Sequence, residues 1–293
     1  MKSWDPRRWI KRSIPADDPS ALWPVTFTGF LMYYCFPYRR AVVMSNIQHV
    51  FGDQLNQAQR VRLAQAFYSH LLCSVKETLG MCFLSQNAIR DRVEVQGHEN
   101  LMHQASQERG VLILTGHFGS WEFAPLGGIL NFKAFQGHFH FIRRSLGFGR
   151  LQSWLFKRYE RAGLKVILKE NAMTQVQAAL EKNHAVVFVL DQHASLANRD
   201  GVAVEFFGEK AGTYRSLASL SRHLNIPVVP AASYRLPNGK HVLAFYEPLV
   251  WQEYPTTQES IYQNTLAYNQ ALERIILANP PQWMWSHRRW KLR

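Results

Sequence analysis

Cysteine is scarce in this sequence, and several patterns that would define a chemistry directly are missing. The 293 residues contain three cysteines, Cys35, Cys73 and Cys82, an odd number with no Cys-x-x-Cys or Cys/His metal spacing. This count excludes a disulfide framework, and we interpret the three as reduced core residues of a cytosolic protein. The chain also lacks internal repeats, low-complexity tracts and a clear interdomain linker.

Two catalytic patterns are absent as well. No Gly-x-Ser-x-Gly nucleophile elbow occurs, and no cysteine lies beside the histidine motif described below. We therefore expect no covalent enzyme intermediate on a serine or a cysteine. The zinc motif His-Glu-x-x-His is also missing, and we expect neither a metal nor a cofactor.

Acidic residues are few relative to basic ones. The chain has 34 lysines and arginines against 21 acids, which gives a net charge of +13 and a pI near 9.9. Such an excess implies an anionic partner: nucleic acid, an acidic membrane surface or a phosphorylated substrate. A non-catalytic basic protein that binds nucleic acid or membrane would account for this charge, and it is the rival from another functional class.

An uncharged stretch lies near the N-terminus. Residues 21–38 are 18 residues without a charge, slightly fewer than the ~20 apolar residues of a membrane span. Aromatic residues such as Trp23 and Tyr33 suit the headgroup level. We favour a helix that lies in or dips into the inner leaflet; a full span and a buried helix of the soluble domain are the alternatives. Residues 1–40 are interpreted as a membrane-associating segment, with no cleavage site to indicate a signal peptide.

Strand and helix patterns alternate along the rest of the chain. Strands are predicted at 111–115, 137–142, 165–168, 185–190, 227–232 and 241–246, and helices at 56–79, 118–130, 150–161, 172–182, 213–224 and 260–278. This alternation predicts an α/β fold with a mostly parallel sheet covered by helices on both faces. We expect one such domain over residues 41–293.

The central stretch runs from Val111 to Glu122. A buried strand ends at Gly116, so His117 stands on a strand-to-helix corner, where α/β proteins expose catalytic side chains. With Glu122 in the first helical turns, the two side chains can meet. Glu122 would keep one imidazole nitrogen protonated and leave the other to take a proton from a substrate hydroxyl. A capping role for His117 is the alternative.

The same spacing occurs once more, in His103 and Glu108. These two lie in a polar stretch that reads as a helix without a glycine corner. We interpret them as two solvated side chains.

Further candidates follow other predicted strands. Arg143 follows one and is placed to meet a phosphate or an oxyanion, whereas the adjacent Arg144 reads as solvated. Asp191 ends the most hydrophobic strand, where it would orient an acceptor or pair with an arginine, a structural ion pair being the alternative. Thr213 reads as a helix cap next to the site. The terminal segment 283–290 mixes cations with tryptophans, which suits an anionic lipid interface, although packing of the tryptophans would also explain it.

These residues carry a family resemblance. Gly116-His117-Phe-Gly-Ser-Trp-Glu122 resembles the signature of the lipid A late acyltransferases, bacterial lauroyl and myristoyl transferases. Further blocks resemble the family in order, from about residue 39 to the end: Arg39-Arg40 with Asn46-Ile47 and Phe51, Arg143, Asp191-Gln192, Phe206-Phe207-Gly208 with Thr213, Pro227 to Pro230, and Pro281 to Lys291. The ordered series is much more specific than the His-x4-Glu spacing alone.

The resemblance implies a glycerol-3-phosphate acyltransferase-like α/β fold and an enzyme at the cytoplasmic face of a bacterial inner membrane. His117 and Glu122 would be catalytic. Arg143, Asp191, Gly119 and Thr213 would bind substrate. The donor would be an acyl carrier protein thioester, or acyl-coenzyme A, and the acceptor a hydroxyl of a lipid A precursor or related lipid, with no nucleic-acid partner. A glycerolipid, glycolipid or polyketide-lipid acyltransferase of the same superfamily is the close alternative.

The chain departs from the family pattern twice. Gly147-Phe148 stands where the family usually has Asn-Pro, and Asp191-Gln192-His193 replaces Asp-x-Asp. Both departures bear on the identity of the acceptor more than on the reaction.

Overall fold

A computed structural model describes residues 23–36, 38–132, 136–143, 149–168, 172–197 and 200–292. Residues 1–22, which carry the basic start of the predicted membrane segment, lie outside the described residues. So do Arg144 and the Gly147-Phe148 departure.

The sheet of the described chain has seven strands in the order β1-β9-β8-β2-β5-β3-β4. The strands are β1 (Val93–Gln96), β2 (Val111–Thr115), β3 (Phe139–Arg143), β4 (Leu164–Leu168), β5 (Ala185–Val189), β8 (Val228–Arg235) and β9 (His241–Phe245). Every neighbouring pair is parallel except β8 with β9. The α/β architecture with a mostly parallel sheet is therefore as predicted.

The central strand β2 shows why this sequence forms a two-sided sheet. Leu112 and Leu114 enter one hydrophobic cluster, and Val111 and Ile113 enter the other. Successive side chains of a strand point to opposite faces, so an unbroken apolar run serves a strand that is buried on both sides. The edge of the sheet beyond Thr115 is then the place where polar side chains reach solvent.

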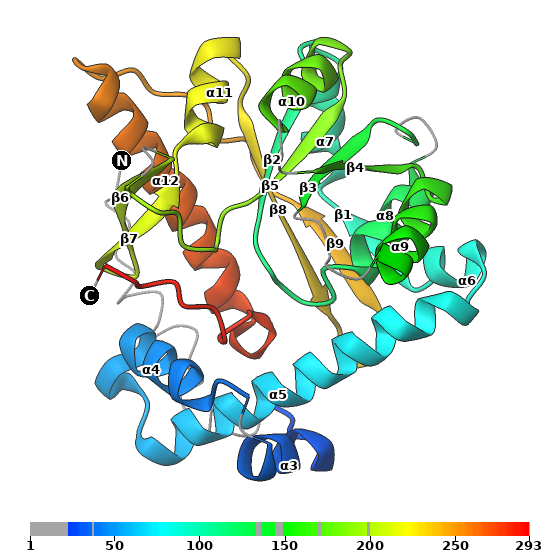
Figure 1. Ribbon diagram of the computed structural model, residues 1–293, viewed down its shortest axis with the longest axis vertical. Coiled ribbons are helices and arrows are strands. Elements are labelled where there is room, and N and C mark those ends of the chain that lie inside the picture. The colour runs from blue at the N-terminus through cyan, green and yellow to red at the C-terminus, as the bar shows by residue number, and fades with distance from the viewer. Residues whose placement is uncertain are drawn as a thin grey trace.

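Helices cover both faces (Figure 1). The first cluster receives side chains of α3 (Phe27–Cys35), α4 (Arg40–Phe51), α5 (Gln57–Gly80), α10 (Ala172–Glu181), α11 (Ser216–Leu224) and α12 (Thr257–Ala278). The second cluster receives those of α6 (Gln86–Arg90), α7 (His98–Ala105), α8 (Phe123–Asn131) and α9 (Gly149–Arg161). Short 3-10 turns follow α4, α5 and α12, at Gly52–Gln54, Met81–Phe83 and Pro280–Gln282.

The N-terminal uncharged segment forms only the nine-residue helix α3, which packs on α5 (Figure 1). Gly29 allows the contact, because a Cβ there would lie 1.9 Å from Ser69 Oγ. Ser69 Oγ also accepts a hydrogen bond from the backbone of Thr26 at 3.0 Å. Within the described residues, no helix combines the length and the apolar character that crossing a membrane requires. Cys35 is exposed, so its prediction as a core residue was wrong.

Residues 201–214 differ from the predicted pattern. They form an antiparallel hairpin, β6 (Gly201–Phe206) and β7 (Glu209–Tyr214), and the helix predicted from 213 begins only at Ser216. Phe207 and Gly208 make the two-residue turn, with φ of +53° and +78°, as in the turn type that matches strand twist. Helix α8 likewise begins at Phe123 rather than at 118, so the catalytic corner is longer than expected.

Candidate active site

The site forms where two neighbouring parallel strands end. Thr115 of β2 is in register with Val189 of β5. His117 lies two residues beyond β2, and Asp191 lies two residues beyond β5. Parallel strands end at the same sheet edge, so the register alone places His117 opposite Asp191.

Asp191 holds His117 through two hydrogen bonds. The backbone N–H of His117 donates to Oδ2 at 2.8 Å, and the ring Nδ1 contacts Oδ1 at 2.9 Å. The indole Nε1 of Trp283 donates to Oδ2 at 3.0 Å. Asp191 has no exposed surface. Burial alone would raise its pKa, but the charge of His117, its two hydrogen bonds and the nearby His287 hold the pKa of the carboxyl well below its usual range.

This pairing fixes the chemical state of His117. The carboxylate accepts from Nδ1–H, so the lone pair of the neutral ring is on Nε2. The side-chain amide of Gln192 lies 3.4 Å from Nε2. Burial alone would lower the pKa of His117, but Asp191 more than offsets this and raises the pKa above the ordinary value for histidine. The ring thus has the arrangement of a general base held in one tautomer.

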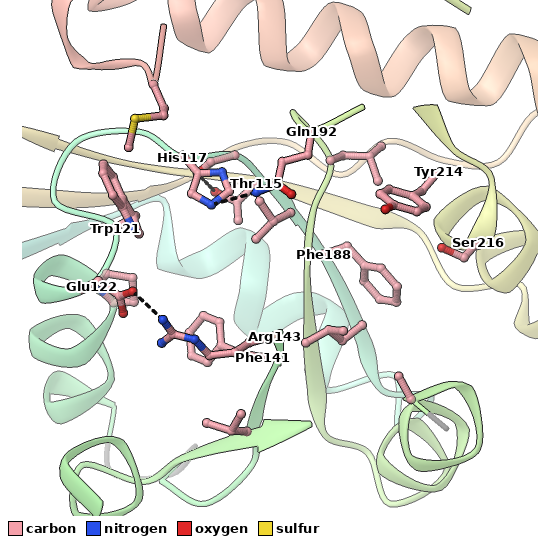
Figure 2. A pocket seen from close by; sticks show the side chains of 18 of the residues that line it. Thr115, His117, Trp121, Glu122, Phe141, Arg143, Phe188, Gln192, Tyr214 and Ser216 are labelled. Atoms are coloured by element: carbon pink, nitrogen blue, oxygen red, sulfur yellow. Dashed lines mark hydrogen bonds and ion pairs between the residues drawn. The ribbon is translucent and has the colours of Figure 1, made fainter. Parts of the chain in front are cut away.

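Glu122 does not occupy the place predicted for it. Its carboxylate lies 3.3 Å from the Arg143 guanidinium and accepts a hydrogen bond from the Tyr159 hydroxyl. Figure 2 shows Glu122 turned toward Arg143, with His117 beside Gln192. We expected Glu122 to orient the His117 ring directly, and this was wrong. Asp191 bonds Nδ1 of the ring instead, because β5 lies next to β2 in the sheet. Glu122 still acts on His117 through its charge, which raises the pKa of the ring.

An apolar cavity of about 990 Å³ opens in front of His117. His117, Trp121, Glu122 and Arg143 line one side, and Phe188, Tyr214 and Ser216 line the other (Figure 2). Between them the wall is hydrocarbon, contributed by Phe141, Leu164, Val166, Met173 and Leu190. A mostly apolar cavity with a few convergent polar groups at one end is the usual form of a small-molecule site.

Two residues expected to bind substrate have other roles. Gly119 and Thr213 are not among the described residues that line the cavity. Gly119 has a φ of +54°, and a Cβ there would lie 2.3 Å from the carbonyl oxygen of Ser233, so the corner requires glycine. Thr213 is fully buried in β7, where its Oγ1 accepts from Arg289 at 2.7 Å. The role of Thr213 as a helix cap is thereby corrected as well.

The C-terminal segment packs against the site. Trp283, Trp285, Trp290 and Arg289 are all buried, which favours the packing explanation over a lipid interface. Met284 N donates to the carbonyl of His117 at 3.1 Å. Arg289 donates to the carbonyls of Gln192 and Gly212 and to Thr213 Oγ1. The segment thus supports both strand ends that carry the site.

His287 is a second histidine that sequence reasoning did not assign to the site. It lines the cavity, and its ring lies edge-on to that of His117 with centroids 4.7 Å apart. Burial lowers its pKa to about 4, so it is neutral near pH 7. Ligand atoms of His117, Asp191 and His287 all lie within 4.8 Å of one another. These are the residues that could hold a metal ion, although both oxygens of Asp191 already accept hydrogen bonds.

At one edge of the mostly parallel α/β sheet, a histidine–aspartate pair faces an apolar cavity, which is the arrangement of a general base beside an apolar binding site. Sequence comparison gives the family. Residues 20–292 match the family described as bacterial lipid A biosynthesis acyltransferase, so the chain belongs to this family and is an acyltransferase. The resemblance carried by the ordered blocks is confirmed.

Two relatives come from Escherichia coli strain K12. The lipid A biosynthesis palmitoleoyltransferase is 25% identical over 262 residues, which are 87% of this chain and 79% of the relative. The lipid A biosynthesis lauroyltransferase is 26% identical over 266 residues, which are 88% and 81%. The solved structure of the 1-acyl-sn-glycerophosphate acyltransferase PlsC from Thermotoga maritima matches 87% of this chain and 97% of its own. Its identity is 14% and its TM-score 0.36, a likeness too low to support an argument.

Proposed function

We propose that this acyltransferase moves a fatty acyl chain from an acyl carrier protein thioester to a hydroxyl of a lipid A precursor. The observation that carries the proposal is the His117–Asp191 pair at one end of the apolar cavity. The base and the space for a hydrocarbon chain adjoin, as direct transfer of an acyl group requires. The names of the relatives support lipid A chemistry for the acceptor.

The proposed reaction needs a single base. His117 Nε2 takes the proton of the acceptor hydroxyl as its oxygen attacks the thioester carbonyl carbon. A C–O bond forms, the C–S bond of the tetrahedral intermediate breaks, and the departing thiolate takes the proton from His117. The products are an ester and a free thiol, and no acyl-enzyme forms. Asp191 stabilises the imidazolium that exists between the two proton transfers.

Arg143 supplies the positive charge in this proposal. Glu122 and the Tyr159 hydroxyl, 3.3 Å from the guanidinium, hold it on the cavity wall. Arg143 would bind a phosphate of the acceptor or stabilise the oxyanion, because the guanidinium is charged and preorganised. Glu122 then acts by anchoring Arg143, which replaces the direct catalytic role expected from the sequence.

Helix α3 supports a place at the cytoplasmic face of the inner membrane. Phe27 is 75% exposed and Phe36 69%, and Phe30, Tyr34 and Tyr38 are exposed as well. A short helix without charges and with an outward aromatic face suits the level of the lipid headgroups. Arg39 and Arg40 contribute less than expected, because they donate to the carbonyls of Ser286 and Tyr33.

The test is an assay of the purified full chain with two donors and two acceptors. Myristoyl- or lauroyl-acyl carrier protein and the matching acyl-coenzyme A are each offered a lipid A precursor or lysophosphatidic acid, and products are identified by mass. We expect an acylated lipid A precursor, formed faster from the carrier protein. Transfer to lysophosphatidic acid alone would instead establish the glycerolipid alternative.

A further inference from the structure

A second polar cluster, partly buried, lies behind the His117 corner. It consists of His70, Ser74 and Glu77 on α5, Arg235 at the end of β8, His241 on β9 and Gln282 before the terminal segment. None of the six is among the described residues that line the cavity. Two buried imidazoles beside a partly buried carboxylate and guanidinium are costly unless they are paired, so the cluster needs an explanation.

The cluster closes a ring of hydrogen bonds on Gly119, two residues after His117. His70 Nε2 contacts the Gly119 carbonyl at 3.0 Å, and Gly119 N donates to the Gln282 carbonyl at 2.9 Å. The side-chain amide of Gln282 pairs with the backbone N–H and C=O of Arg235, at 2.7 and 2.9 Å. Arg235 Nη1 completes the ring at His70 Nδ1, at 2.7 Å.

The hydrogen-bond partners of the His70 imidazole allow only one protonation state. A guanidinium can only donate, so His70 Nδ1 is an acceptor and the proton of the neutral ring is on Nε2. That proton points at the Gly119 carbonyl. Burial, and then the charge of Arg235, lower the pKa of His70 to about 4, so the ring is neutral throughout the physiological range. Glu77 compensates the Arg235 charge with two hydrogen bonds to the guanidinium.

The backbone on the other side of the corner is held as firmly. Ser233 Oγ donates to the Phe118 carbonyl at 2.7 Å. On the α5 side, Ser74 Oγ lies 3.2 Å from His70 Nε2 and makes a longer contact of 3.4 Å with the same Gly119 carbonyl. Gly119 has a left-handed backbone conformation and packs directly against Ser233 and Tyr234 of β8, so the corner cannot move toward that strand. The carbonyl of Gly119 is therefore one of the backbone groups that position the corner, and it is the one that His70 holds.

We propose that His70 is a positioning residue of the acyl transfer: oriented by Arg235, it holds the Gly119 carbonyl and thereby aims the His117 ring at Asp191 and the cavity. The inference rests on the proposed function, because it takes His117 as the base. His70 does not touch the reacting atoms. Its loss should rotate or loosen the corner, and misplacing a catalytic group by about 1 Å costs on the order of 10²-fold in rate.

The test compares His70→Gln with His70→Asn in the full chain. Both are neutral amides, but the longer glutamine can place an N–H where Nε2 stands, and the shorter asparagine reaches only the position of Nδ1. We expect His70→Asn to lower kcat by about 10²-fold with KM little changed, and His70→Gln to recover most of the loss. The acid limb of the pH–kcat profile should also move to lower pH in His70→Asn, because a looser Asp191 contact raises the pKa of His117 less.

His140→Asn is the matched control. His140 lies near the start of β3, whereas Arg143 of the site ends that strand. It is partly buried, and its Nε2 lies 2.9 Å from Nδ1 of His184. Its replacement should leave kcat and the pH–kcat profile unchanged. Wild-type kcat in His70→Asn, or equal impairment of both His70 variants with an unmoved profile, would overturn the positioning role. His117→Ala in the same series separates the two failures, because an active His117→Ala variant would overturn His117 as the base, whatever the His70 variants show.

Discussion

The Nδ1 of His117 lies 2.9 Å from Oδ1 of Asp191, a residue 74 positions away in the chain. The contact is set by sheet register, since each residue stands two positions beyond one of two adjacent parallel strands. It makes Asp191, rather than Glu122, the partner of the proposed base. Glu122 pairs with Arg143 instead.

Replacing His117 with alanine should remove the base. We expect acyl transfer to fall by ~10²–10⁴-fold, because the imidazole that Asp191 holds in its base form is lost. The fold should remain intact, although the melting temperature should fall because the buried Asp191 carboxylate loses its ring partner. His103→Ala, an exposed residue of α7 with the same His-x4-Glu spacing, is the control and should be silent. Full activity of His117→Ala would refute the mechanism.

Asp191→Asn should reveal the coupling through pH. The base form of His117 is the unprotonated one, so activity rises as pH rises through its pKa. Asp191 raises that pKa, and burial alone would lower it. The substitution should therefore shift the acid limb of the kcat profile to lower pH. The plateau should still fall by roughly 10²–10⁴-fold, since the tautomer is no longer fixed. An acid limb that stays in place or moves to higher pH would contradict the pairing.

The same carboxylate links stability to pH. The pKa of Asp191 is depressed in the folded protein, so its stabilising contribution is present above the ordinary pKa of an aspartate and is lost as pH falls through the depressed value. Asp191→Asn should therefore flatten the decline of the unfolding free energy below about pH 4. Denaturant titrations of both proteins from pH 2 to 7 would measure this, and parallel curves would count against it.

How much of this site was visible in the sequence depends on the range of each contact. The apolar run at 111–115 and the glycine corner are local signals, and they placed β2 and His117 correctly. The Asp191 contact depends on β5 lying beside β2, which strand patterns alone do not specify. The spacing between His117 and Glu122 is also local. The Glu122 side chain pairs with Arg143, however, and that contact depends on where β3 lies in the sheet.

Composition alone did not distinguish a lipid interface from a protein core at residues 283–290, because the same residue types suit both. Tryptophans and arginines at 283–290 suit a lipid interface, yet Arg289 is buried because four polar acceptors surround it, two carbonyls and the side chains of Thr213 and Asn269. The hairpin β6–β7 was missed because Phe207-Gly208 lacks the Asn or Asp usual in such turns. The backbone N–H of Phe207 donates instead to Glu273, on α12.

Glu122 and Arg143 should behave as one unit. Glu122→Ala and Arg143→Ala should each lower activity, and the double variant should be little worse than either. We expect a coupling energy of roughly 0.5–3 kcal/mol from the cycle of kcat/KM values. The exposed pair Arg222–Glu253 is the control and should show no coupling in activity. Additive losses at Glu122 and Arg143 would mean that the two act separately.

The exposed aromatic side chains of α3 and of its C-cap residue Phe36 should carry membrane binding. Replacing Phe27, Phe30 and Phe36 with serine should weaken flotation with anionic vesicles by at least about tenfold, because each buried phenylalanine contributes roughly 1.5–3 kcal/mol. The control triple replaces Met102, Val250 and Leu292, which are also exposed but lie outside α3. Equal flotation of both triples would place the anchor elsewhere.

His193, where the chain departs from its family, should prove neutral for the choice of acceptor. It is not among the described residues that line the cavity, and its ring lies against Gly212. Within the described part of the chain its buried Nδ1 has no hydrogen-bond partner, and the bond that the ring makes is to the backbone of Arg289. Burial and the nearby charges of Lys291 and Arg289 lower its pKa. An aspartate at this place would therefore meet two cations, on the side away from the substrate.

We accordingly expect His193→Asp to leave the products unchanged, both with a lipid A precursor and with total inner-membrane lipids as acceptors. Gln192→Ala is the contrasting variant, because that amide lies 3.4 Å from His117 Nε2 and lines the cavity. Its loss should lower transfer to every acceptor. A gain of lipid A precursor activity in His193→Asp, read by product mass, would instead show that this position reaches the acceptor and that the departure from the family pattern has changed the substrate.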